Sequence, residues 1–127
     1  MITGAHLLLY SANPEADRAF FRDVLRFPSV DAGEGWLIFR LPPSEVALHP
    51  MEGERRVLHA GHHLQSGVLY LMCSDVRSQV ESLSARGVSA GEIVEAPWGI
   101  TTTIRLPSGG EIGLYQPTHP TALNLER

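Results

Sequence analysis

One short unit occurs twice in this chain, and the repeat limits the folds that the chain can adopt. Near the C-terminus, the turn Leu106–Gly110 leads into the alternating stretch Glu111–Tyr115. In the first half, Leu41–Ser44 leads into a similar stretch, Glu45–His49, which ends at Pro50. Proline and glycine turns that bound short alternating runs indicate β-strands. The repeat therefore predicts a chain built from two equivalent halves.

The alternation in the two repeated stretches divides their side chains between two faces. Alternate residues of a strand point to the same side of the sheet. The residues expected to face a core are Val46, Leu48, Ile112 and Leu114. Those expected on the other face are Glu45, Ala47, His49, Glu111, Gly113 and Tyr115. We expect this second face to line a binding site.

Each half is predicted to contain a strand, a helix and three further strands. In the first half, the strand is Ala5–Tyr10, and a helix begins at Asn13-Pro14 and ends at Phe27-Pro28. Asparagine is a favoured N-cap and proline a favoured first helical residue. In the second half, Val68–Cys73 is the strand and Asp75 the cap of a helix that ends at Arg86-Gly87. The remaining predicted elements are a hairpin at Val30–Gly35, a strand at Trp36–Leu41, an extended segment at Val88–Ala96 and a strand at Trp98–Leu106.

The predicted elements define an α+β fold in one domain, residues 1–127. Its parts are module one at about 4–51, a connector at about 52–66, module two at about 67–117 and a loosely held tail at 118–127. A single βαβββ unit cannot cover its own sheet face. We therefore expect the two units to lie side by side in a curved mixed sheet, or incomplete barrel, with helices outside.

Composition excludes several classes of partner. The net charge is −4 and there is no basic run, so nucleic acid is not an expected partner. No apolar run is long enough to cross a bilayer, and the N-terminus lacks the features of a signal peptide. Cys73 has no second cysteine with which to pair, so we expect a buried reduced thiol. These features predict a cytoplasmic protein with no membrane partner.

The connector contains a histidine cluster whose role the sequence leaves open. His59, His62 and His63 lie close together around Gly61. Such a cluster binds metal when further ligands are held in a fixed frame. A solvated loop also carries such residues.

Three stretches of the chain resemble the vicinal oxygen chelate superfamily, which includes glyoxalase I, extradiol dioxygenases, methylmalonyl-CoA epimerase and the bleomycin- and mitomycin-binding resistance proteins. They are Gly4–Tyr10 with Ala19–Leu25, then Asp75–Gly87, then Leu106–Ile112. The resemblance covers about residues 4–117. It implies paired βαβββ modules around a cavity, and a homodimer whose modules pack across the interface.

The resemblance also implies where a divalent metal would bind. The metal enzymes of the superfamily carry ligands on the first and last strand of each module, and these positions fall on His6, Val68, Ala47 and Gly113. Only His6 can ligate, whereas catalytic metal sites need about three protein ligands. We therefore expect no cofactor. A relocated site for Zn, Ni, Mn or Fe is the alternative, with the donors His6, Glu45, His49 and Glu111.

The favoured hypothesis is a metal-free protein that binds a small aromatic or amphipathic molecule. The resemblance gives its expected lining as His6, Leu8, Tyr10, Ala47, His49, Val68, Tyr70, Met72, Gly113 and Tyr115. Small side chains at Ala47 and Gly113 would leave room for a flat ligand, and Trp36 or Trp98 could stack on it. A metal-dependent lyase, isomerase or dioxygenase is one alternative. Catalysis with His6 as general acid or base, and a regulatory dimer with a vestigial cavity, are the others.

Overall fold

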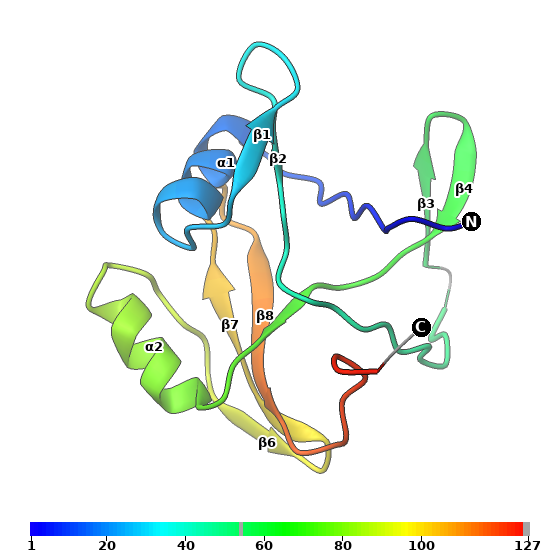
Figure 1. The fold of residues 1–127 in the computed structure, drawn as a ribbon. Coiled ribbons are helices and arrows are strands. Elements are labelled where there is room, and N and C mark those ends of the chain that lie inside the picture. The colour runs from blue at the N-terminus through cyan, green and yellow to red at the C-terminus, as the bar shows by residue number, and fades with distance from the viewer. Residues whose placement is uncertain (54, 126–127) are drawn as a thin grey trace. The chain divides into compact units, whose positions relative to one another are not determined.

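The computed structural model describes residues 1–53 and 55–125 and shows an α+β chain, as predicted. Figure 1 shows the helices and the strands. In chain order they are α1 (Pro14–Asp23), β1 (Ser29–Asp31), β2 (Leu37–Phe39), β3 (Arg56–His59), β4 (His62–Gln65), β5 (Tyr70–Met72), α2 (Val76–Ser84), β6 (Val94–Ala96), β7 (Gly99–Arg105) and β8 (Glu111–Pro117).

The chain divides into two compact units. The first unit comprises Met1–Arg40 and Arg105–Glu111, and the second comprises Leu41–Ile104 and Ile112–Arg127. Each unit is described separately below. The predicted division into modules at about 4–51 and 67–117 stays a prediction.

The second unit contains the βαβββ order that the sequence predicts for the second half. Strands β5, β8, β7 and β6 form one sheet in that order, with β5 parallel to β8 and β6 antiparallel to β7. Helix α2 connects β5 to β6. The Asp75 side chain caps this helix by accepting a hydrogen bond of 3.1 Å from the Ser78 amide. The N-cap of this helix is therefore the residue that the sequence predicts.

Seven buried residues form the core of the second unit. They are Val76, Leu83, Val88, Ile104, Ile112, Leu114 and Tyr115. Ile112 and Leu114 are buried as the alternation predicts. Tyr115, expected on the other face, is buried as well, because the rings of Tyr70, Trp98 and His119 pack on it. Each large apolar side chain that is fully buried contributes about 1.5–3 kcal/mol to stability.

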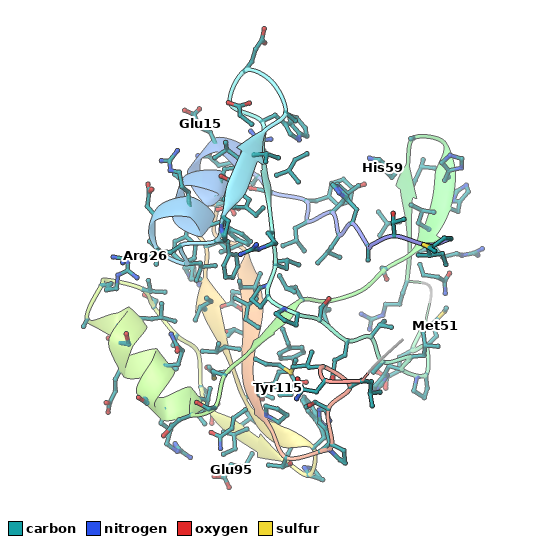
Figure 2. All side chains as sticks on the ribbon, viewed as in Figure 1. Glu15, Arg26, Met51, His59, Glu95 and Tyr115 are labelled. Carbon is teal, nitrogen blue, oxygen red and sulfur yellow. The ribbon has the colours of Figure 1, made fainter. Side chains whose placement is uncertain are left out.

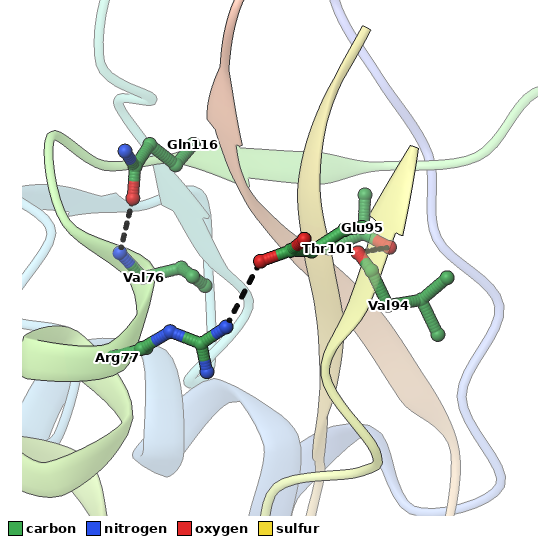
Figure 3. A network of polar contacts seen from close by, with 6 residues as sticks. All are labelled: Val76, Arg77, Val94, Glu95, Thr101 and Gln116. Atoms are coloured by element: carbon green, nitrogen blue, oxygen red, sulfur yellow. Dashed lines mark hydrogen bonds and ion pairs between the residues drawn. The ribbon is translucent and has the colours of Figure 1, made fainter. Parts of the chain in front are cut away.

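Polar contacts attach α2 to the strands of the same unit (Figure 3). The Val76 amide, one of the amides at the start of α2, donates a hydrogen bond of 3.1 Å to Oε1 of Gln116 on β8. Arg77 forms an ion pair of 3.2 Å with Glu95 on β6, but both side chains are exposed. Exposed pairs stabilise little. The Gln116 contact is therefore the more important of the two.

Helix α1 of the first unit begins as the sequence predicts. Asn13 is the N-cap, its side chain accepts a hydrogen bond of 3.2 Å from the Ala16 amide, and Pro14 is the first helical residue. The helix ends at Asp23, a few residues before the predicted end at Phe27-Pro28. Strands β1 and β2 then form a hairpin that is longer than predicted, because its second strand is part of the strand predicted at Trp36–Leu41.

A buried carboxylate connects α1 to the turn between β7 and β8. Asp17 is 7% exposed and accepts hydrogen bonds of 2.6 Å from Ser11 Oγ and from Ser108 Oγ. The Ser108 amide donates a further bond of 3.0 Å to the same carboxylate. Hydrogen bonds to an ionised group are stronger than those between neutral groups. Asp17 therefore holds the Leu106–Gly110 turn against the helix within the first unit.

Two predicted strands of the first half are wrong. Residues 5–10 and 45–49 belong to no sheet in the described part of the chain. Val46 and Leu48, predicted to face a core, are 88% and 96% exposed. The alternating pattern assigns side chains to faces, but a strand forms only where a neighbouring edge supplies hydrogen bonds. Neither segment pairs with such an edge here.

The predicted connector contains a hairpin rather than a simple solvated loop. Strands β3 and β4 pair antiparallel with His59 opposite His62. Ala60 and Gly61 form the two-residue turn with φ values of 51° and 81°, as a type I′ turn requires. His59, His62 and His63 are exposed on this hairpin. Residue 54, also in the predicted connector, lies outside the described residues. Among the described residues, neither helix is long and apolar enough to cross a membrane.

Candidate functional site

Three aromatic rings of the second unit meet on its sheet, and we call Tyr70, Trp98 and Tyr115 the aromatic cluster. The ring centroids are 6.1 Å apart for Tyr70 and Trp98, 5.3 Å for Tyr70 and Tyr115, and 5.7 Å for Trp98 and Tyr115. All three pairs are edge-to-face, with interplanar angles of 70° to 79°. This geometry is favourable because the positive edge of one ring meets the negative face of the next.

Strand register and two glycines make this packing possible. The parallel pairing of β5 with β8 places Tyr70 opposite Gly113 and Met72 opposite Tyr115. The Tyr70 ring occupies the space that a Cβ atom on Gly113 would need. A Cβ atom on Gly99 would lie 3.1 Å from Cδ2 of Tyr115 and 2.8 Å from the Gln116 carbonyl oxygen. Both rings therefore pack directly on backbone where a side chain is absent.

The three rings differ in exposure. Tyr115 lies on β8 (Figure 2). Its side chain is 9% exposed, whereas Tyr70 is 39% and Trp98 is 45% exposed. The buried ring gives the cluster a fixed base, and the other two leave aromatic surface open to solvent. Large exposed aromatic side chains beside a rigid strand are typical of binding sites.

His119 covers Tyr115 from the C-terminal segment. Its ring stacks on the Tyr115 ring at 25° with the centroids 6.1 Å apart. Its Nδ1 lies 2.7 Å from the Pro120 carbonyl oxygen, and its Nε2 lies 3.2 Å from the Tyr115 hydroxyl. A carbonyl only accepts, so Nδ1 carries the proton in the neutral ring and Nε2 accepts from the Tyr115 hydroxyl.

Further hydrogen bonds hold the C-terminal segment to the second unit, where the sequence predicted a loosely held tail. The Thr118 amide and hydroxyl donate bonds of 3.0 Å to the carbonyls of Trp98 and Pro97, respectively. The Ala122 amide donates a bond of 2.7 Å to the Glu45 carboxylate. Residues 118–122 are therefore part of the candidate site. Residues 126–127 lie outside the described part of the chain.

Burial controls the ionisation of two groups around the cluster. Desolvation raises the pKa of the Tyr115 phenol above its ordinary value, and the negative charge of Glu45 raises it further. Desolvation also raises the pKa of the half-buried Cys73 thiol, which lies 3.7 Å from the Tyr115 carbonyl oxygen. Both groups are therefore protonated at neutral pH, and Cys73 is a poor nucleophile.

The structure brings together only some of the ten residues predicted to line a pocket. Tyr70, Met72, Gly113 and Tyr115 meet where β5 pairs with β8. Ala47, His49 and Val68 also belong to the second unit but are exposed and outside its strands. His6, Leu8 and Tyr10 belong to the first unit.

Two members of the candidate site differ from their expected roles. The space expected beside Gly113 is filled by the Tyr70 ring rather than left for a ligand. His119 was not predicted at all, because it lies outside every strand and helix, between Pro117 and Pro120. Trp98, expected as a possible stacking partner, is a member of the cluster. Trp36 instead lies in the first unit, with the Arg18 guanidinium 4.4 Å from its ring.

The donors of the alternative metal site are divided between the units. Glu45 and His49 belong to the second unit, where Glu45 bonds the Ala122 amide and His49 Nδ1 lies 2.9 Å from the Pro50 carbonyl oxygen. His6 and Glu111 belong to the first unit. In residues 1–53 and 55–125, no three His, Cys, Asp or Glu side chains are grouped so that they could hold a metal ion.

The second unit also has a groove of about 480 Å³ beside the C-terminal end of α2. Its lining is Val80, Ser84, Gly87, Val88, Ser89, Ala90, Gly91 and Ile93. These residues include no aromatic and no ionisable side chain that could orient a ligand. The aromatic cluster is therefore the stronger candidate.

Comparisons with known proteins identify the fold. No protein family and no curated protein matches the chain by sequence. An antibiotic-binding protein, TnmS3 from Streptomyces sp. CB03234, is 21% identical, with a TM-score of 0.59, over 93% of this chain and all of that one. Lactoylglutathione lyase from Agrobacterium tumefaciens is 18% identical, with a TM-score of 0.61, over 90% and 92%. A glyoxalase/bleomycin resistance protein from the same Streptomyces strain is 22% identical, with a TM-score of 0.51, over 80% and 90%.

The chain has the glyoxalase/bleomycin resistance fold. This confirms the resemblance at the level of the fold, which hosts both binding proteins and enzymes. In this chain the second unit carries the complete βαβββ order, and the aromatic cluster is built on its sheet.

Proposed function

We propose that this protein binds a flat aromatic small molecule at the aromatic cluster and needs no metal to do so. The observation that carries the proposal is the pair of exposed rings, Tyr70 and Trp98, packed against the buried Tyr115 ring. A ring stacked on an aromatic side chain gains about 0.5–1.5 kcal/mol beyond the area that it buries. Two such contacts on a rigid base suffice for a weak to moderate complex.

The solved structures support this proposal by analogy. One protein with this fold is described as an antibiotic-binding protein and another as a glyoxalase/bleomycin resistance protein. Another protein with this fold, from Agrobacterium tumefaciens, is described as a lactoylglutathione lyase. The resemblance puts metal ligands at Ala47 and Gly113, but neither residue has a side-chain atom that can coordinate a metal ion. Binding without metal therefore fits this chain better.

Tryptophan fluorescence tests the proposal. The Trp36→Phe variant removes the other tryptophan, so that emission reports on Trp98 alone. We expect polycyclic aromatic compounds from a screening set to quench this emission saturably. Tyr70→Ala, in the same Trp36→Phe background, should weaken binding about tenfold. Absence of saturable quenching by every compound, with the fold intact by circular dichroism, would refute the proposal.

We also propose that the protein forms a homodimer. Segments 5–10 and 45–49 have the alternation of strands but belong to no sheet, and they leave Leu8, Val46 and Leu48 exposed. A second copy would supply the edges that these segments need and would bury apolar surface. Light scattering after size exclusion should give twice the mass of one chain at micromolar concentration. A single-chain mass under these conditions would contradict the proposal.

We further propose that the protein acts in the cytoplasm. Its one cysteine, Cys73, is a free half-buried thiol, which persists most readily in a reducing compartment. Cell fractionation that recovers the protein outside the cytoplasmic fraction would contradict this.

A further inference from the structure

The C-terminal segment makes three contacts of the kind that a ligand would make, two with Tyr115 and one with Glu45. A flat heteroaromatic ring, His119, stacks on Tyr115. A ring nitrogen of the same residue accepts the Tyr115 hydroxyl hydrogen. An N–H group, the Ala122 amide, points at the Glu45 carboxylate at 2.7 Å. The segment thus offers a stacked ring and an acceptor to Tyr115, and a donor to Glu45.

Glu45 gives this site a negative charge that forms no ion pair within residues 1–53 and 55–125. Its side chain is half-buried, and no Lys, Arg or His side chain of the described residues forms an ion pair with it. Its charge is felt at Tyr115, where it contributes to the raised pKa of the phenol. The faces of aromatic rings are also negative, so rings beside a carboxylate attract cations. The Ala122 amide carries no net charge, so it does not gain this attraction.

We propose that residues 118–122 occupy the position of the ligand, and that the ligand is a flat aromatic base with a protonated nitrogen. Its ring replaces His119 on Tyr115, and its N–H group replaces the Ala122 amide at Glu45. This rests on the proposed function and adds to it the charge of the ligand and the displacement of the segment. Displacing His119 also exposes the Tyr115 face, so the ligand contacts all three rings.

Two opposite effects of substitution follow. Because His119 competes with the ligand, His119→Ala should tighten binding about three- to tenfold, the loss of one ring-stacking contact. Because Glu45 pairs with the ligand, Glu45→Gln should weaken the binding of a cation about tenfold. The same Glu45→Gln variant should bind an anion of the same shape as tightly as the unsubstituted protein does, or more tightly. A residue that merely supports the fold would weaken all binding in the same direction.

The probes are 9-aminoacridine, a cation at neutral pH, and acridine-9-carboxylate, an anion with the same three fused rings. Isothermal titration calorimetry of the full chain measures both dissociation constants for the unsubstituted protein, Glu45→Gln and His119→Ala. Glu92→Gln and His63→Ala are matched controls, since both residues are exposed in the second unit and outside the candidate site. Both controls should bind like the unsubstituted protein.

The outcomes separate the two proposals. We expect the unsubstituted protein to prefer the cation by at least about tenfold, and Glu45→Gln to abolish the preference. Equal binding of both probes, or weaker binding by His119→Ala, overturns the inference but leaves aromatic binding standing. Binding of neither probe overturns the inference. If the fluorescence screen then also finds no ligand, the proposed function fails with it. As a second readout, the NMR signal of the His119 ring in the unsubstituted protein should shift on saturation with the cation, and an unchanged signal overturns the displacement.

Discussion

Replacing Asp17 tests whether one buried carboxylate holds the turn between β7 and β8 in place. The carboxylate accepts two bonds of 2.6 Å from Ser11 and Ser108 hydroxyls and one of 3.0 Å from the Ser108 amide. In Asp17→Ala the hydroxyls can turn to other acceptors, but the amide loses its partner, which costs about 1–3 kcal/mol. Loss of a negative charge from the first helical turn adds about 0.3–1 kcal/mol.

The sum of these effects is a loss of about 3 kcal/mol in the free energy of unfolding. The unfolding entropy is about 2.1 cal/mol/K per residue near the midpoint, so for 127 residues this loss lowers the thermal midpoint by about 11 °C. Scanning calorimetry of Asp17→Ala measures the shift. Asp17→Asn, which keeps the shape and one oxygen acceptor, should lose roughly half as much.

Asp23→Ala is the matched control, because Asp23 lies on the same helix and its carboxylate also has a close partner. That partner is Arg22, and both side chains are more than half exposed. We expect the midpoint of Asp23→Ala to stay within experimental error of the unsubstituted protein. Equal midpoints for Asp17→Ala and Asp23→Ala would show that the buried hydrogen bonds contribute nothing, and would refute the reasoning.

Three further predictions follow from the second unit. Gly113→Ala should expel the Tyr70 ring from its place, lower stability by about 1–3 kcal/mol and reduce the near-ultraviolet circular dichroism; an unchanged spectrum would contradict this packing. Ile104→Ala, at a fully buried position, should cost about 3 kcal/mol in denaturant unfolding, and a cost under about 1 kcal/mol would contradict its place in the core. Tyr115 should titrate above its ordinary pKa in ultraviolet difference spectra, and Glu45→Gln should lower that pKa. The pKa of the Tyr115 phenol is higher in the folded state than in the unfolded state. Its contribution to the free energy of unfolding is therefore complete below about pH 10 and is lost as the pH rises through the folded-state pKa.

The sequence predicted those features that depend on neighbours in the chain. Asn13 and Asp75 cap their helices because each side chain bonds an amide three residues later, and such a contact can be read from the sequence alone. The burial of Ile112 and Leu114 also follows from local alternation. The hairpin of β3 and β4 was missed because its turn places Ala60 at positive φ, where glycine or asparagine is the usual signal.

Features that depend on distant partners were not predictable in this way. The pattern at 45–49 is as strand-like as that at Glu111–Tyr115, yet only the latter forms a strand, because β5 and β7 supply edges on both of its sides. His119 contacts Tyr115 from four residues further along the chain, beyond the end of β8 and outside any helix. No periodicity marks such a contact. Both cases show that local sequence sets which face a residue prefers, whereas pairing depends on the rest of the fold.

Gly113 connects the expected loss of a metal ligand to the presence of the aromatic cluster. The resemblance places a metal ligand at position 113, on the last strand of the second module. A side chain of any size there would collide with the Tyr70 ring, which packs directly on this glycine and meets Tyr115 and Trp98 from that position. A ligating side chain at 113 and a ring at 70 therefore exclude each other on this pair of strands. The glycine at the ligand position that the resemblance implies is therefore the same residue that makes room for the aromatic cluster.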